Sequence, residues 1–220
     1  WTFDEGAGNT AGDLSANGNT ATQAGTAGSW ITGKADEAYE LGGSDCRFEL
    51  LSGSGDLQVT GAVTVSAWVN STAASSYGLI AGIDDVGGTA NDMYALKTDG
   101  SDKPHWAVIG PGTDVGLTAS STLSTLGAAG DGWVHLVGVY DPDTEFAGLY
   151  TNGVLADSTT TVPPSIQSIP ATPFQIGHNA SDSGGYPLNA AVDDIQVYDQ
   201  ALSAAQIAYL CNSPGNALSA

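Results

Sequence analysis

The sequence predicts an all-β protein, a sandwich of two antiparallel sheets with one short C-terminal helix. Three observations predict this fold class. Segments rich in Val, Ile, Thr, Trp and Tyr recur about every ten to twenty residues, and clusters of Gly, Asn, Asp, Ser and Pro separate them. Apolar and polar residues alternate along residues 63–69, as they do in a strand with one face on a core. Segments with helical periodicity are nearly absent before residue 203.

The strand at residues 63–69 has the clearest pattern. Its odd-numbered positions, from Val63 to Val69, are apolar and define one face. The opposite face carries Trp68, so we expect that face to be partly covered as well. Further strand candidates lie at residues 78–82, 93–98, 105–109, 133–140, 147–152, 154–158, 173–177 and 190–198.

Two local signals predict a hairpin and a helix. The Asn152-Gly153 pair between apolar runs predicts a tight antiparallel hairpin. Ser203 has the residue type of a helix N-cap, and Gln206 three positions later completes a capping-box pattern. The polar, small residues of 112–132 predict a loop.

The chain is strongly acidic. It has 220 residues with 4 Lys and Arg against 24 Asp and Glu, a net charge of −20 and a pI near 4.1. The electrostatic field of this negative charge repels polyphosphate, which argues against nucleic acid and anionic membrane surfaces as partners. The acidic residues either keep the protein soluble or, where carboxylates converge, bind a hard cation such as calcium. No apolar run approaches the roughly 20 residues that span a bilayer, so membrane insertion is not expected.

Length and composition favour one domain over residues 1–213, followed by a tail or linker at 214–220. The chain opens on Trp1 without a signal-peptide pattern, so we expect a mature fragment or a domain excised from a larger multidomain protein. Cys46 and Cys211 are far apart in sequence. They predict one disulfide if the protein is extracellular, although two free buried thiols fit nearly as well.

Four groups of residues, in order, resemble one family. They are residues 1–8 with the turn at 13–19, residues 65–69, residues 133–141 with 149–153, and residues 192–203. Together they are similar to the laminin-G-like, concanavalin A-like lectin/glucanase jelly-roll domains of secreted bacterial proteins. In the turn, Ala16 stands where the family usually has Gly. The resemblance implies two curved sheets packed face to face, and a secreted protein.

The resemblance also implies a structural calcium site that joins the two ends of the domain. The matching positions are Asp13, Asn17 and Asn19 in the turn and Asp193 or Asp194 in the last strand. These oxygen-bearing side chains are of the type that calcium prefers. A regular strand points Asp193 and Asp194 to opposite faces, and we favour Asp194. The alternative is that the turn residues only bond their own backbone and the aspartates are solvated.

A glycan site needs an exposed aromatic platform and polar side chains that bond to hydroxyl groups. Trp106, Tyr77 and Tyr186 are the preferred platform candidates, although a core position fits Trp106 equally well. The remaining candidates, which also lie in or beside loops, are Tyr94, His178, Asn179 and Asp182.

These features predict a non-catalytic carbohydrate-binding or adhesion module whose partner is a glycan or polysaccharide, or a cell-surface protein. One alternative is a structural or protein-interaction spacer without a sugar site. A second alternative is a polysaccharide hydrolase or lyase on the same fold. The sequence has no strand with closely spaced carboxylates of the glucanase kind, no G-x-S-x-G turn, no H-E-x-x-H helix and no P-loop, so no catalytic residue is assigned.

Overall fold

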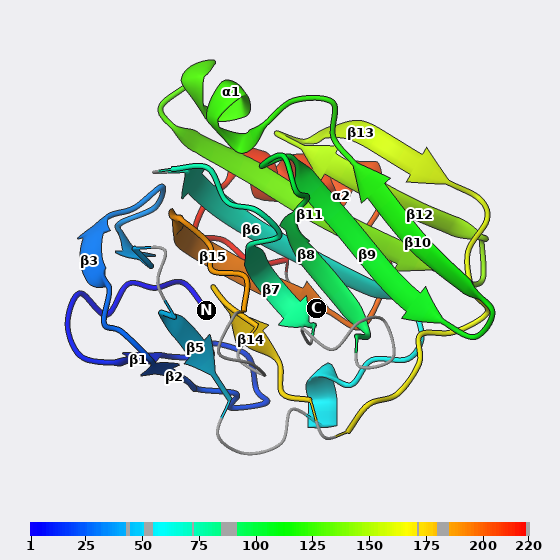
Figure 1. Cartoon of the computed structure of the whole chain (residues 1–220), viewed down its shortest axis with the longest axis horizontal. Helices are drawn as coiled ribbons and strands as arrows, with labels where there is room; N and C mark the ends of the chain where they lie inside the picture. The colour runs from blue at the N-terminus through cyan, green and yellow to red at the C-terminus, as the bar shows by residue number, and fades with distance from the viewer. Residues whose placement is uncertain are drawn as a thin grey trace.

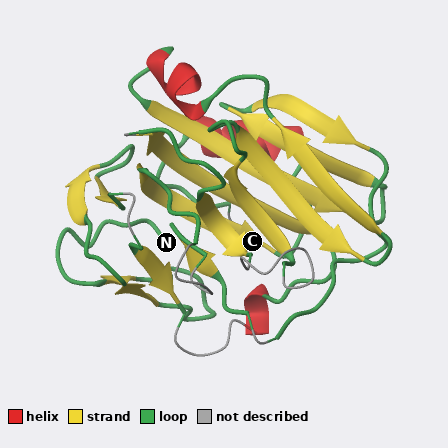
Figure 2. Cartoon of the chain, viewed as in Figure 1, coloured by secondary structure: helices red, strands yellow, loops and turns green. Residues whose placement is uncertain are grey.

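The computed structural model describes residues 1–42, 45–50, 55–71, 73–84, 92–170, 172–179 and 185–218. These residues form two antiparallel sheets packed face to face (Figures 1 and 2). The predicted two-sheet sandwich is therefore confirmed. In spatial order, the eight-stranded sheet contains β1 (Thr10–Ala11), β2 (Ala21–Ala24), β5 (Arg47–Glu49), β14 (Gln175–Ile176), β7 (Leu79–Ile83), β8 (Tyr94–Thr98), β9 (Pro104–Gly110) and β10 (Thr113–Thr118).

The second sheet packs on the first and carries the C-terminal helix on its outer face. In spatial order, this seven-stranded sheet contains β13 (Val154–Thr159), β12 (Phe146–Thr151), β11 (Trp133–Asp141), β6 (Val63–Ser71), β15 (Ala190–Tyr198), β4 (Glu37–Glu40) and β3 (Ser29–Thr32). The helical segments are a 3-10 turn (Gly55–Leu57), α1 (Leu123–Ala128) and α2 (Ala204–Asn212). No helix among the described residues is long and apolar enough to cross a membrane.

Strand β6 runs through the middle of the seven-stranded sheet with both faces covered, as its sequence predicts. Val63, Val65 and the other odd-numbered residues join the core between the sheets. On the opposite face, Trp68 is 4% exposed and packs with Trp133 in a smaller cluster. The hydrogen-bonded partners β11 and β15 flank β6, so its backbone groups are paired on both sides.

Trp106 connects the two sheets. It is fully buried, and its indole N–H donates to the carbonyl of Val139 at 3.1 Å. The ring lies against Gly138, where a Cβ atom would approach it to 2.2 Å. Tyr94 is also buried, and its hydroxyl donates to the carbonyl of Leu57 at 2.6 Å. The prediction that Trp106 and Tyr94 contribute to a binding surface is therefore wrong, because both rings fill the core.

The two local signals are confirmed. Asn152 and Gly153 have φ values of 49° and 77°, as a tight hairpin turn requires, and they join the antiparallel strands β12 and β13. Ser203 and Gln206 form the reciprocal capping box at the start of α2. The buried Ile207 and other apolar residues of α2 pack on the outer face of the seven-stranded sheet, which makes this side three layers deep.

The predicted loop at 112–132 instead contains strand β10 and helix α1. Strand β10 lies at the edge of its sheet and exposes Asp114 and Gly116, so its apolar positions are few. Helix α1 has only 6 residues and is capped by Thr122, whose hydroxyl accepts from the Thr125 N–H at 3.3 Å. Segments this short and polar give too little periodicity for a sequence pattern to identify.

The predicted disulfide is also absent, because both cysteines are free. Cys46 is buried in the core between the sheets. Cys211 lies on α2 and packs with Trp68 and Trp133 on the outer face of the seven-stranded sheet. The two thiols are thus separated by this sheet, and a disulfide requires Cα atoms within about 7 Å of each other.

Replacing Trp106 should test its role in joining the sheets. We expect Trp106→Ala to lower the free energy of unfolding by about 3–5 kcal/mol, because the large ring leaves a cavity that the sheets cannot close. Urea denaturation measures the change. Tyr209→Ala is the control, since this tyrosine on α2 is 47% exposed. Equal stability of the two variants would contradict the assignment.

Candidate functional site

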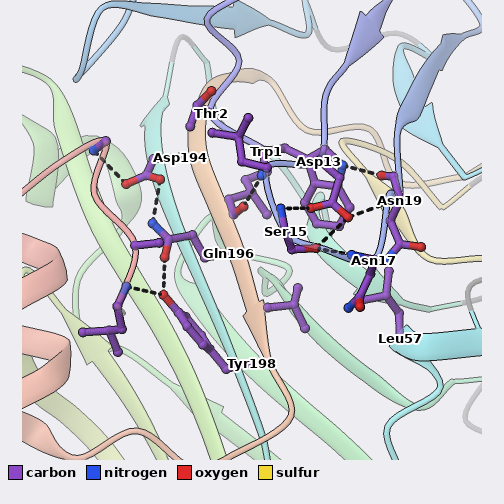
Figure 3. Close-up of a pocket in the computed structure, with 16 residues that line it drawn as sticks. Trp1, Thr2, Asp13, Ser15, Asn17, Asn19, Leu57, Asp194, Gln196 and Tyr198 are labelled. Atoms are coloured by element: carbon purple, nitrogen blue, oxygen red, sulfur yellow. Dashed lines mark hydrogen bonds between the residues drawn. The ribbon is translucent and has the colours of Figure 1, made fainter. Parts of the chain in front are cut away.

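A pocket of about 450 Å³ lies between the end of β15, the turn at residues 13–19 and the C-terminal residues 214–218 (Figure 3). It brings together most residues of the predicted calcium site. Its apolar lining includes Trp1, Leu57, Val197 and Leu218, and its polar lining includes Asp13, Asn17, Asn19, Asp194, Gln196 and Tyr198. The C-terminal residues pack here, since Gly215 N–H donates to Asp194 Oδ2 at 3.0 Å.

A bulge in β15 decides where the two neighbouring aspartates point. The register shifts between Asp193 and Gln196, and Asp194 has a left-handed φ of 47°. Asp193 Oδ2 accepts from the N–H groups of Lys34 and Ala35, at 2.8 and 3.0 Å, in the β3–β4 turn. Asp194 instead lines the pocket. The structure thus places Asp194, and not Asp193, in the same pocket as the turn.

Asp13 organises its own turn. Its Oδ1 accepts from Ser15 N–H at 2.8 Å, and its Oδ2 accepts from Asn19 N–H at 2.7 Å and from the Ser15 hydroxyl at 2.8 Å. Burial acts to raise the pKa of Asp13, but these hydrogen bonds outweigh burial and hold the pKa below its usual value. The turn is therefore closed by the side chain itself.

The donor set does not fit calcium as the side chains are arranged. Calcium takes six to eight oxygen ligands. Figure 3 shows Asp13 and Asp194 on either side of Trp1, and both carboxylates already accept hydrogen bonds from the protein. Within the described ranges, no three His, Cys, Asp or Glu side chains form a group that could hold a metal. Calcium therefore stays a prediction from the resemblance that this arrangement of donors does not support, and chelation tests it.

A second region gathers four of the predicted binding residues where strand β7 begins and strand β8 ends. Tyr77 and Tyr186 are 48% and 38% exposed, and their ring centroids are 5.2 Å apart. Tyr77 has a φ of 60°, a left-handed conformation that is unfavourable for a bulky side chain. Its N–H donates to the carbonyl of Asp99 at 3.1 Å, and its ring lies on Gly100, where a Cβ atom would meet the hydroxyl at 2.9 Å.

The two loops that carry the tyrosines are bonded to each other and to the sheet. Leu79 N–H donates to the carbonyl of Tyr186 at 3.3 Å. Ser75 Oγ accepts from Asn189 N–H at 2.8 Å, and the carbonyl of Ser75 accepts from the hydroxyl of Thr98 at 3.0 Å. These bonds fix the relative position of the rings before any ligand arrives.

A series of hydrogen-bonded polar side chains connects to the backbone of Tyr186. Lys97 Nζ lies 2.6 Å from Asp84 Oδ2, and the Asp84 side chain is 5% exposed. Asn179 Nδ2 approaches Asp84 Oδ1 at 3.4 Å, while Asn179 Oδ1 accepts from Tyr186 N–H at 2.8 Å. Asn179 thus links the ion pair to the backbone of the exposed tyrosine.

Small residues form a row on the outer face of the eight-stranded sheet. Direct cross-strand partners share a face, and four of them form one row across β7, β8, β9 and β10. Their neighbours Leu96, Trp106 and Leu117 point into the core, so the row faces outward. The row consists of Gly82, Ala95, Ala107 and Gly116.

His178 is buried and does not face solvent. It is 6% exposed, and its Nδ1 has no hydrogen-bond partner. Burial lowers the pKa of the imidazole and so favours its neutral form. Gly185 packs against the ring. Asp182, the remaining predicted binding residue, lies outside the described residues.

The profile of the concanavalin A-like lectin/glucanase superfamily, in its laminin-G form, matches residues 42–208. The chain belongs to this superfamily. The match covers most of the chain, including both tyrosine loops and strand β15. No curated protein sequence matches the chain.

Solved structures show the same fold at low sequence identity. The binding domain of paraclostridial mosquitocidal protein 1 has a TM-score of 0.68 and 16% identity over 92% of this chain and 49% of its own. The binding domain of botulinum neurotoxin DC, solved with SialylT, has a TM-score of 0.63 and 13% identity, and the match covers 96% of this chain and 52% of that domain. Domain 4 of the arabinanase AbnA from Geobacillus stearothermophilus, solved with arabinotriose, has a TM-score of 0.58 and 20% identity. This match covers 85% of this chain and 82% of that domain. The chain spans about half the length of the two toxin domains.

In this concanavalin A-like domain, the structure separates the predicted binding residues by role. Tyr77 and Tyr186 are exposed, Asn179 accepts from the Tyr186 N–H, and His178 is buried. Asp84 and Lys97 were not predicted from the sequence. One signal was available, since Lys97 is one of only 4 basic residues and lies in an otherwise apolar strand, where a charge requires a partner.

Chelation should test the calcium prediction. We expect excess EDTA to change the melting temperature by less than about 1 °C, because protein donors already satisfy Asp13 and Asp194 and no bound ion would be removed. Differential scanning calorimetry with and without added calcium provides the measurement. A drop of several degrees on chelation, reversed by calcium, would instead establish the ion.

Asp193 should make stability depend on pH. Burial raises its pKa to about 7, and its Oδ1 has no partner. The folded chain therefore holds a proton that the unfolded chain releases near pH 4, so the free energy of unfolding falls as pH rises from about 4 to about 7. Urea denaturation across this range should show a shallower fall in Asp193→Asn. An unchanged slope would show that Asp193 does not titrate there.

Proposed function

We propose that the domain is a non-catalytic carbohydrate-binding module and that Tyr77 and Tyr186 form its sugar platform. The observation that carries the proposal is the pair of neighbouring, exposed rings held over a buried polar network. Tyrosine supplies a rigid apolar face for a sugar ring and a hydroxyl for hydrogen bonding, at a low cost in conformational entropy.

The backbone of Tyr77 supports a binding role. A left-handed φ for a large residue costs free energy and persists only where the surrounding structure imposes it. Here the ring has no core to fill, because it is 48% exposed. The loop bonds around Ser75 hold both rings in place, which lowers the entropy lost on binding.

The charges favour a neutral glycan. The net charge of −20 repels anionic polymers. Three of the 4 basic side chains are already paired with carboxylates, in the pairs Lys34–Asp131, Arg47–Glu49 and Lys97–Asp84. Asp84 is itself ion-paired and buried, so it is not free to act as an acid or nucleophile on a sugar.

Two structural neighbours support a glycan ligand. Domain 4 of AbnA was solved with arabinotriose, and this chain spans 82% of it. The neurotoxin DC binding domain was solved with SialylT. By analogy with AbnA, which is described as extracellular, we propose that this domain works in a larger secreted protein.

Affinity gel electrophoresis should test the platform. We expect a neutral polysaccharide such as arabinan, xylan or β-glucan to retard the protein, and pectin or alginate not to. Tyr77→Ala and Tyr186→Ala should each weaken the retardation roughly two- to twelvefold, from about 0.5–1.5 kcal/mol for a ring contact. Tyr209→Ala is the matched control, because this equally exposed tyrosine lies on α2.

The other outcomes separate the alternatives. Retardation that neither tyrosine affects would place the sugar site elsewhere. Shortening of a polymer would indicate an enzyme. If no polymer slows the protein, the protein-interaction or spacer alternative replaces the proposal.

A further inference from the structure

A buried carboxylate is bonded to the loop that carries Tyr77. Asp102 is 5% exposed, and its Oδ1 accepts from the Ser75 N–H at 3.0 Å. Asp102 belongs to the turn at residues 99–102, between β8 and β9, and the Tyr77 ring rests on Gly100 of the same turn. The turn therefore holds this loop at two places, at the aromatic ring and at the backbone two residues earlier.

Ser75 joins the two tyrosine loops to each other. Its N–H donates to Asp102, and its carbonyl accepts from the Thr98 hydroxyl at 3.0 Å. Its own hydroxyl accepts from the N–H of Asn189 at 2.8 Å, and Asn189 follows Tyr186 by three residues. A displacement of Ser75 would therefore change the position of one tyrosine loop relative to the other.

The same turn is attached to helix α1. The Asp102 carbonyl accepts from the Leu123 N–H at 3.0 Å, and α1 lies against β6 and β11 of the seven-stranded sheet. Burial raises the pKa of the Asp102 carboxyl, while hydrogen bonds from the backbone of Ser75 and Ser124 act to lower it. A carboxyl in such a place depends on these N–H groups as partners, and they come from two separate segments of the chain.

We propose that Asp102 is a positioning residue of the tyrosine platform, which sets the separation of the Tyr77 and Tyr186 rings through Ser75. This inference rests on the proposed sugar platform. Asp102 is too deeply buried to form part of the platform surface, so its effect on binding passes through the rings. Rings held at a fixed separation lose less conformational entropy when a sugar binds.

Two substitutions at Asp102 form a matched pair. The φ of Asp102 is 64°, a left-handed conformation that Gly adopts without strain and Asn tolerates. Asp102→Gly removes the acceptor for the Ser75 N–H, whereas Asp102→Asn keeps an amide oxygen at that place. Asp143→Gly is the control, because Asp143 is exposed in the β11–β12 turn. That turn lies near the start of β6, and the Tyr77 loop follows the end of β6.

The separation of the rings can be followed directly by NMR. Nuclear Overhauser effects should connect the two rings of the unmodified protein, whose centroids are 5.2 Å apart. At a temperature well below melting, Asp102→Gly should lose these effects. It should also weaken retardation by a neutral polysaccharide about two- to twelvefold, the range for losing one ring contact. Asp102→Asn and Asp143→Gly should retain both properties.

A double variant separates positioning from a general loss of stability. In a Tyr77→Ala background, Asp102→Gly should weaken retardation no further, because the remaining ring has no partner at a fixed separation. Two changes that act through one contact are not additive, whereas independent changes are. Affinity gel electrophoresis of the two single variants and the double variant provides the comparison.

Ring-to-ring effects that persist in Asp102→Gly would overturn the proposal. So would a loss that Asp102→Asn shares in full, or one that adds to the loss from Tyr77→Ala. If Asp102→Gly does not fold, Ser75→Ala replaces it, since that change removes the acceptor for the Asn189 N–H, and unchanged ring-to-ring effects would again count against the proposal. If no polysaccharide retards the unmodified protein, the sugar platform fails, while the NMR comparison still tests Asp102.

Discussion

Burial of apolar side chains between the two sheets is the constraint on which the rest of the structure depends. Trp106 crosses this interface and occupies the space that Gly138 leaves empty, so the two sheets meet at one fixed separation. Val63, Val65, Ala67 and Val69 of β6 point into the same layer. With the sheets fixed, the loops at their ends have defined starting points, and the surface features follow from there.

The tyrosine platform shows how this scaffold positions a surface site. The start of β7 lies beside the end of β8, and Lys97 of β8 pairs with Asp84, which follows β7. Asn179 connects that pair to the backbone of Tyr186. A buried ion pair contributes little net stability, but it fixes geometry, and here that geometry is the position of an exposed ring.

The bulge in β15 has a comparable effect at the other site. A regular strand would point Asp193 and Asp194 to opposite faces of the sheet. The left-handed Asp194 instead directs one carboxylate to the β3–β4 turn and the other to the C-terminal residues. The residues at this bulge thus tie both chain ends to the same strand, since Ile195 O accepts from the Trp1 nitrogen and Asp194 accepts from Gly215 N–H.

The sequence by itself determined the fold class, the hairpin at Asn152 and the capped helix at Ser203, because these depend on local periodicity and on turn and cap chemistry. It also identified Tyr77 and Tyr186 as candidates. Only the tertiary structure decided that Trp106 is core and that the two cysteines lie on opposite sides of a sheet. Burial and pairing between distant segments depend on how the sheets pack, and no local pattern records that.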